Sequence, residues 1–332
     1  MRSDFNCQEQ NIIDFTVVIP TYNGATRLPQ VFNRLQDQIK VEAISWEVLV
    51  VNNNSTDNTE QVVQKYQSNW PSTSPLRYCF EPRQGLVFAR EKAIQNARGE
   101  LVGFIDDDNR PAPNWVSEAY AFGQTHPKAG AYGSKIKGVF EVEPNENLKG
   151  LLFYLALVDR GDCPLKYNPR TIGFPPGAGL VVRRSAWRDF VPNPNRLIGS
   201  LGSPKLPCDD YEVLFPIYKA GWEIWYNPNM FIEHLISSNR LEADYFIQLV
   251  QRIGLCRHHF RMMCFRPWQR PFAFCLYLGN DVRKALTYFM QHRNALKTDI
   301  AAVCEMERLR NTIISPFYLF KLRLDRQLNL FK

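Results

Sequence analysis

The sequence has no long apolar run and no apolar leader. A membrane-spanning helix needs roughly 18 uninterrupted apolar residues, and the longest candidates, such as "PFAFCLYLG" at 271–279, are about half that length. The first segment, "MRSDFNCQEQN", is polar and lacks the apolar centre of a signal peptide. These absences predict a cytoplasmic protein without a spanning helix.

Paired cysteine spacing is also absent. The eight cysteines occur singly, with no Cys-x-x-Cys pair, which predicts reduced thiols in a reducing compartment. The segment "CRHHFRMMC" at 256–264 combines Cys and His, but its spacing matches no common zinc pattern, so we interpret it as helix. Internal repeats and low-complexity linkers are not found.

The charge is unevenly distributed along the chain. The net charge is +7, and residues 251–332 carry 15 Lys or Arg against 5 Asp or Glu, which leaves a net of −3 for the first 250 residues. A near-neutral body with a basic tail predicts an anionic partner for the tail. The 45% hydrophobic content supports a folded core rather than general disorder.

Short β-rich runs alternate with helical patterns in the first part of the chain. We expect strands at 15–20, 46–51, 76–80 and 101–105, separated by helices that end near residue 39 or span 58–67 and 85–97. This alternation predicts βαβ units and a mostly parallel sheet. In such sheets, ligands bind beyond the carboxyl ends of the strands.

The second half is less regular. Further strand-like runs lie at 130–136, 177–187 and 223–228. A helix that begins with two acidic residues is expected at 209–222, although Pro216 lies inside it. Two basic helices are expected in the tail, at 240–265 and 280–310, joined by "RPWQRPFAFCLYLG".

Polar segments follow three of the expected strands. "PTYN", "NNNS" and "DDD" each come directly after an apolar run. An acidic loop alone is usually a solvent-exposed feature, but three polar strand ends at one sheet edge favour a binding site. Carboxylate oxygens without abundant His or Cys select Mg²⁺ or Mn²⁺ rather than zinc. The Asp-x-Asp at 106–108 is a loose pattern that gains weight from the preceding strand.

Six segments in order carry a resemblance to a known family. "VVIPTYNGATRL", "EVLVVNNNSTDNT", "EPRQGLVFAREKAI", "GFIDDDNRPAPNWV", "GAGLVVRRSAW" and "DDYEVLFPIYKAGWEIWYNP" together resemble family-2 glycosyltransferases, most closely cyanobacterial-type enzymes of exopolysaccharide and hormogonium polysaccharide synthesis. The resemblance covers roughly residues 14–235. It implies an α/β GT-A fold, with a mostly parallel central sheet flanked by helices.

The resemblance also implies a domain organisation and a reaction. Residues 1–13 would form a tail, 14–235 the catalytic domain and 236–332 a basic helical extension. The enzyme would be metal-dependent and inverting, and would move a sugar from a nucleotide-diphosphate donor, most commonly a UDP-sugar, to a hydroxyl of a glycan or lipid-linked acceptor in extracellular polysaccharide synthesis. The processive members have a Gln-x-x-Arg-Trp motif and membrane helices, which this sequence lacks, so we expect non-processive transfer.

Individual positions follow from the same resemblance. The donor would contact Pro20, Thr21, Tyr22, Asn23, Asn53, Arg83, Arg90, Asp106, Asp107, Gly177, Ala178 and Gly179. Asp108 would bind Mn²⁺ or Mg²⁺, with Asp106 and His234 beside it. Two alternatives stay open, because Arg90 could form a buried structural salt bridge and His234 could simply pack. Asn52 and Asn53 stand where the family commonly has an Asp pair, which affects the choice of nucleotide.

The acidic pair at the start of the 209–222 helix matches the family's catalytic pair. Asp210 would be the general base that removes the acceptor proton, and Asp209 would assist it. The alternative is that both carboxylates only stabilise the helix N-terminus, where negative charge is favourable.

The sequence also bears on two other functions and on the partners of the basic tail. A nucleotidyltransferase would need a Gly-rich basic loop after the first strand, which "PTYNGATRL" does not provide. A non-catalytic carbohydrate-binding or scaffold protein would not need Asp108 and Asp210 together. The basic tail predicts peripheral binding to an anionic surface on the inner face of the cytoplasmic membrane. No RNA-binding motif accompanies the charges, so no nucleic acid is expected, and a helical cap over the catalytic domain is the remaining alternative.

Overall fold

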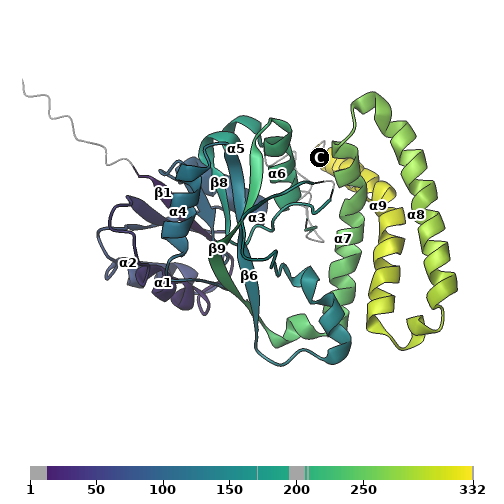
Figure 1. The fold of residues 1–332 in the computed structure, drawn as a ribbon, viewed down its shortest axis with the longest axis horizontal. Coiled ribbons are helices and arrows are strands. Elements are labelled where there is room, and N and C mark those ends of the chain that lie inside the picture. Colours follow the sequence, from purple (N-terminus) through teal and green to yellow (C-terminus); the bar gives the residue numbers. More distant parts are fainter. Residues whose placement is uncertain (1–12, 170, 194–205, 208, 331–332) are drawn as a thin grey trace, which may run out of the picture.

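A computed structural model describes residues 13–169, 171–193, 206–207 and 209–330, and the side chains up to residue 325. In Figure 1 an α/β body lies beside a group of three long helices at the C-terminal end. The expected tail at 1–13 falls almost entirely outside the described residues.

The strands come first. They are β1 (Phe15–Thr21), β2 (Trp46–Asn52), β3 (Leu76–Phe80), β4 (Leu101–Phe104), β5 (Asn109–Pro111), β6 (Ala129–Phe140), β7 (Leu165–Lys166), β8 (Leu180–Arg183) and β9 (Glu223–Ile236). The α-helices are α1 (Leu28–Gln36), α2 (Thr59–Gln67), α3 (Leu86–Asn96), α4 (Trp115–Thr125), α5 (Arg184–Phe190), α6 (Asp209–Lys219), α7 (Ala243–Met263), α8 (Arg270–His292) and α9 (Ile300–Leu330). Short 3₁₀ segments are η1 (Glu146–Leu155), η4 (Ser238–Leu241), η5 (Pro267–Gln269) and η6 (Ala295–Lys297).

One sheet in the order β3-β2-β1-β4-β8-β6-β9-β5 forms the centre of the body, and β7 pairs with β9. The first four strands are parallel, as the βαβ pattern predicted. Beyond β4 the sheet changes, because β8 runs antiparallel to both β4 and β6, while β6 and β9 are parallel. The sheet is therefore mixed, and only its N-terminal half matches the mostly parallel expectation.

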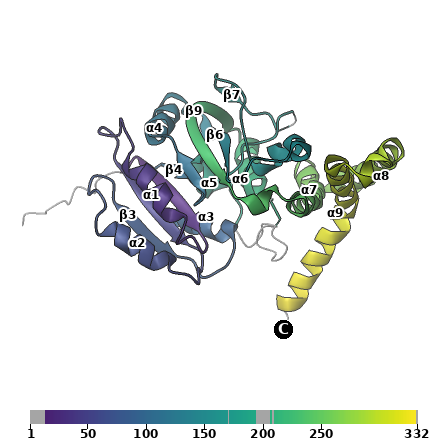
Figure 2. The ribbon, with the colours of Figure 1, turned by 90° about the horizontal axis from the view of Figure 1, so that it is seen from below.

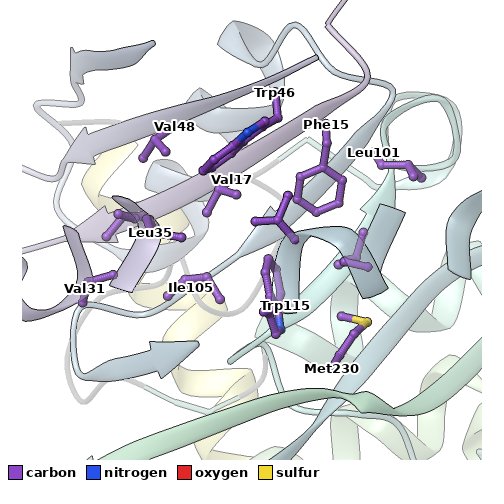
Figure 3. Close-up of a cluster of buried hydrophobic side chains, with 14 of the residues drawn as sticks. Phe15, Val17, Val31, Leu35, Trp46, Val48, Leu101, Ile105, Trp115 and Met230 are labelled. Carbon is purple, nitrogen blue, oxygen red and sulfur yellow. The ribbon is translucent and has the colours of Figure 1, made fainter. Parts of the chain in front are cut away.

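Helices bury both faces of this sheet. Every residue of β1 and β2 is buried, which is typical of parallel strands covered on two sides. On one face α1, α2 and α4 pack around Phe15, Trp46 and Trp115, with the Phe15 and Trp115 rings edge to face at 6.0 Å between centroids (Figure 3). On the other face α3, α5 and α6 complete a second cluster. This packing fixes the carboxyl ends of β1, β2 and β4 at one edge.

The C-terminal extension differs from its prediction. The helix expected at 280–310 is instead two helices, because α8 ends at His292 and α9 begins at Ile300. The apolar segment at 271–279, expected as a connection, lies within α8, where Pro271 occupies the first turn that tolerates proline. The described helices include none that is both long and apolar enough to cross a membrane.

Side-chain contacts attach the extension to the body. Leu148 and Leu155 of η1 pack with Phe246 and Val250 of α7 in a separate apolar cluster. The rings of Tyr211 on α6 and Phe260 on α7 lie 4.3 Å apart. The helix that carries the predicted general base therefore packs directly against the extension.

The cysteines are only partly as expected. Cys79, Cys163, Cys264, Cys275 and Cys304 are free thiols. Cys256, however, is disulfide-bonded, so the prediction of reduced thiols throughout is wrong for this residue.

Candidate active site

A cavity of about 530 Å³ opens beyond the carboxyl ends of β1, β2 and β4. It collects most of the residues that the sequence predicted for donor, metal and catalysis. These are Pro20, Thr21, Tyr22, Asn53, Arg90, Asp106, Asp107, Asp108, Gly177, Ala178, Asp210 and His234. The strand-end segments thus meet at one site, as their positions after parallel strands predicted.

Asp107 connects two of the strand-end loops. Its Oδ2 accepts a hydrogen bond of 2.6 Å from the Thr21 hydroxyl, and its two oxygens accept bonds of 2.9 Å from the Arg27 guanidinium. The Asp107 carboxylate raises the pKa of Arg27, first through this hydrogen bond. Asp107 therefore shapes the cavity wall between β1 and β4.

Asp106 and Asp108 have opposite electrostatic environments. Burial, and next the negative charge of Asp108, raise the pKa of Asp106 to about 6. Burial also acts to raise the pKa of Asp108, but the neighbouring His234 and Arg240 outweigh it and hold that pKa below its usual range. The site therefore keeps Asp108 ionised beside Asp106, whose ionisation is less favourable than that of an ordinary aspartate.

Arg240 is a member of this cluster that the sequence did not predict. Its Nη1 lies 3.0 Å from Asp108 Oδ2 and 2.9 Å from His234 Nε2. Arg240 belongs to η4, beyond the predicted boundary at residue 235, and no local motif marks it. The segment after β9 thus supplies a cation to the cavity.

Asp210 is held by two contacts across the cavity wall. Its Oδ1 accepts a 2.6 Å hydrogen bond from Arg90 Nη1, and its Oδ2 accepts a 2.8 Å bond from the Gly177 amide. The Arg90 side chain is only 4% exposed, whereas that of Asp210 is 36% exposed. Arg90 therefore forms the buried salt bridge that was the alternative for it, while Asp210 stays accessible from the cavity.

The backbone at position 177 lies close to both the Arg90 guanidinium and the Asp210 carboxylate, which explains the glycine there. A Cβ placed on Gly177 would overlap both the Arg90 guanidinium and the Asp210 carboxylate. Gly177 thus keeps the backbone amide within hydrogen-bond reach of Asp210.

Asn53 is tied into the surrounding loops. Its side-chain oxygen accepts a 2.7 Å bond from the Gly85 amide, and its nitrogen donates to the carbonyl oxygens of Arg83 at 2.6 Å and Glu81 at 3.3 Å. The Asn53 amide group consequently joins the end of β2 to the loop before α3.

Four predicted residues do not line the cavity. Asn23 accepts a 2.8 Å bond from the Thr56 amide, and Arg83 pairs with Glu81 at 2.7 Å. Gly179 has φ +64° and packs against Ser134, without room for a side chain. Asp209 is the first residue of α6. These residues support the loops and helix around the site.

Several residues that line the cavity were not predicted from the sequence, because no motif marks them. They are Arg27, Gln84, Leu86, Ala89, Ala156, Pro176 and Arg240. Arg27 could have been suspected from its place after the "PTYN" segment, whereas Ala156 and Pro176 come from irregular segments that only the fold brings to the cavity.

The comparison with protein families decides the identity. Residues 16–188 match the family described as glycosyl transferase family 2. The chain belongs to this family. The match extends from β1 into α5 and so includes the strand ends that form the cavity.

The curated relatives of this family member are distant. The poly(ribitol-phosphate) β-N-acetylglucosaminyltransferase TarS of Staphylococcus aureus is 34% identical over 118 residues, which are 35% of this chain and 20% of TarS. An uncharacterised glycosyltransferase of Nostoc sp. is 23% identical over 229 residues, 63% of this chain and 56% of that protein. The matched segments therefore span well under two thirds of these relatives.

The structural similarity establishes the fold. The mannosyltransferase PcManGT from Pyrobaculum calidifontis, solved with GDP-Man and Mn²⁺, has a TM-score of 0.55 and 20% identity, and the match covers 91% of this chain and 86% of that one. The predicted GT-A fold of the family-2 glycosyltransferase is confirmed.

Proposed function

We propose that this glycosyltransferase moves one sugar per encounter from a nucleotide-diphosphate donor, most simply a UDP-sugar, to a hydroxyl of a glycan or lipid-linked acceptor, with inversion, in extracellular polysaccharide synthesis. The observation that carries the proposal is that Asp108 and Asp210 line one cavity at the strand ends of a family-2 fold. The GDP-Man bound in the structural neighbour PcManGT supports a nucleotide-sugar donor.

The donor would enter at the ends of β1 and β2. Tyr22 is 41% exposed, so its ring is available to the nucleotide base beside Pro20 and Thr21. Arg27 and Arg240 lie on the same cavity and have a surplus of N–H donors, which suits the oxygens of a diphosphate. Asn53 would contribute through the shape of its loop, because its amide group already bonds to backbone.

The donor set at Asp108 fits Mn²⁺ or Mg²⁺. Burial, and next the negative charge of Asp108, raise the pKa of Asp106 to about 6, and a divalent cation would relieve the repulsion between the two carboxylates. His234 faces the Asp108 carboxylate through Nε2, which lies 3.4 Å from Asp108 Oδ2, while its buried Nδ1 has no hydrogen-bond partner among the described residues. Among the described residues no three acidic, His or Cys side chains are grouped as a metal site, so the diphosphate oxygens of the donor would have to supply further ligands.

The metal would act as a Lewis acid for the departing diphosphate. Asp108 would be its principal ligand, with Asp106 and His234 beside it. Arg240 Nη1 lies 3.0 Å from Asp108 Oδ2. Its guanidinium therefore supplies positive charge at the position that the phosphates of the donor would approach.

Asp210 would accept the proton of the acceptor hydroxyl. As the proton moves to the carboxylate, the acceptor oxygen bonds to the anomeric carbon and the bond to the diphosphate breaks. Arg90 and the Gly177 amide fix the orientation of the carboxylate, since each bonds to a different oxygen. Both bonds come from groups outside α6, so the contacts that the structure shows for this carboxylate are not those of a helix cap.

The catalytic domain would extend over 14–235, with 236–332 as an extension that completes the site through Arg240. The two other functions are less well supported. A nucleotidyltransferase would again need a basic glycine-rich loop after β1, and a binding or scaffold protein would have no use for an accessible Asp210 beside Asp108.

A nucleotide-release assay tests the proposal. Purified protein is incubated with a panel of UDP-, GDP- and dTDP-sugars and Mn²⁺ or Mg²⁺, and free nucleoside diphosphate is measured. We expect metal-dependent release from one donor class, lost in Asp108→Asn. Release of pyrophosphate from nucleoside triphosphates, or no release from any donor by a folded protein that binds none of them, would contradict it.

A further inference from the structure

The outer face of α8 is the most exposed apolar surface of the described chain. In Figures 1 and 2, α8 lies at the edge of the molecule farthest from the sheet, with α9 between it and α7. Its inner face packs through Ala273 and Ala285, which are buried. The opposite face has no packing partner among the described residues.

Large apolar side chains line this outer face at helical spacing. We call them the α8 stripe, and its most exposed members are Trp268 (66%), Phe272 (71%), Leu276 (76%), Leu286 (58%), Phe289 (50%) and Met290 (68%). Trp268, just before α8 in η5, is spaced i, i+4 with Phe272 and Leu276, and Leu286 is spaced i, i+3 and i, i+4 from Phe289 and Met290. The two groups lie on the same side of α8, a helix of 23 residues that is about 34 Å long. Exposed apolar side chains gathered on one face mark an interaction site.

The exposed charges around the stripe are mainly positive. Residues 264–298 contain six exposed cations, and their one acidic residue, Asp281, is buried and paired with Arg261. The exposed Asp299 follows directly. The exposed cations are Arg266, Arg270, Arg283, Lys284, Arg293 and Lys297. A binding partner that suits this surface therefore presents both apolar groups and negative charge.

We propose that the α8 stripe binds the surface of an anionic lipid bilayer, with α8 parallel to the membrane plane. A bilayer interface offers acyl chains to the apolar side chains and anionic headgroups to the flanking cations. A second copy of this chain would meet the apolar requirement, but it would bring two sets of cations together.

The aromatic residue Phe274 of α8 is not part of the stripe. Phe274 is half-buried and contacts Phe317 of α9 with ring centroids 6.3 Å apart, so it belongs to the packing between helices. Leu276, in contrast, faces outward.

Vesicle sedimentation tests the proposal with the full chain. Vesicles of phosphatidylcholine alone are compared with equimolar phosphatidylcholine and phosphatidylglycerol, at low and high salt. We expect sedimentation only with the anionic vesicles, and weaker binding as salt rises. A triple variant, Trp268→Ser, Phe272→Ser and Leu276→Ser, should lose binding while keeping the circular dichroism spectrum.

A charge variant and two matched controls distinguish binding through the stripe from nonspecific binding. Neutralising Arg283, Lys284 and Arg293 to Gln should weaken binding by about 10²-fold, since each cation near an anionic leaflet contributes about fivefold. The matched charge control changes Lys40, Lys65 and Lys128 to Gln. The matched apolar control changes Phe80, Val142 and Phe153 to Ser, which are exposed side chains of the body.

Both controls should bind anionic vesicles like the wild type. Equal binding to neutral and anionic vesicles, no binding at low salt, or equal losses in the controls would overturn the proposal. So would light scattering that shows a dimer which dissociates in the triple Ser variant without any vesicle binding, since the stripe would then be an interface between copies.

Discussion

Replacing Gly177 with alanine tests the arrangement around Asp210 with a single methyl group. The backbone at this position is not in the left-handed region, so alanine adds no conformational strain there. The added Cβ would overlap the Arg90 guanidinium and the Asp210 carboxylate, which must move apart. Arg90 is almost fully buried and has little room, so we expect the carboxylate to be displaced from its present orientation.

Two effects of different size follow from this displacement. Overpacking of a well-filled site destabilises a protein by about 1–3 kcal/mol, so a measurable but modest loss of thermal stability is expected. General base catalysis contributes about 10²–10⁴ in rate, and a carboxylate out of reach of the acceptor hydroxyl would lose most of it. The transfer rate should therefore fall by about 10² or more while donor affinity changes little.

The assay is sugar transfer under saturating donor, with donor binding measured separately by calorimetry. Gly150→Ala is the matched control, because a Cβ there meets nothing within 4 Å. A Gly177→Ala enzyme that is folded and transfers sugar at the wild-type rate would refute the idea that Arg90 and the Gly177 amide position the base.

Three further outcomes are expected. Asp108→Asn should keep the fold but lose metal-dependent nucleotide binding, and wild-type binding by calorimetry would exclude Asp108 as the ligand. Asp210→Asn should lower the transfer rate by about 10²–10⁴-fold and Asp209→Asn less, whereas the reverse ranking would assign the base to Asp209. Burial, helped by nearby cations, lowers the pKa of His258 from 6.5 to about 4, so its stabilisation is complete above pH 6.5 and lost as the pH falls towards 4. Between pH 6.5 and 4 the melting temperature of His258→Gln should therefore fall less than that of the wild type. An equal fall in the two proteins would contradict this.

The parallel half of the fold could be predicted from local pattern alone. β1 to β4 are mostly apolar runs bounded by turn residues, and β1, β2 and β3 are each followed by a helix, so the strand ends and their polar loops were expected at one edge. This is why Asp106, Asp108 and Asn53 were found together.

The rest depends on contacts between distant parts of the chain. No periodicity indicates that β8 inserts antiparallel between β4 and β6, because its direction is set by the irregular segment before it. The pairing of Arg240 with Asp108 joins residues 132 positions apart, and nothing near Arg240 in the sequence marks it. The helix predicted at 240–265 corresponds to α7, but the extent of α8 was missed, because apolar residues on both faces hide the helical period in "PFAFCLYLG".

The most direct test of the proposed site is a crystal structure with UDP and Mn²⁺, with the metal located by anomalous scattering. A manganese peak between Asp108 and the diphosphate, with the nucleotide base beside Tyr22, is the result that we predict. A nucleotide bound outside this cavity, or a manganese ion away from Asp108, would contradict the account.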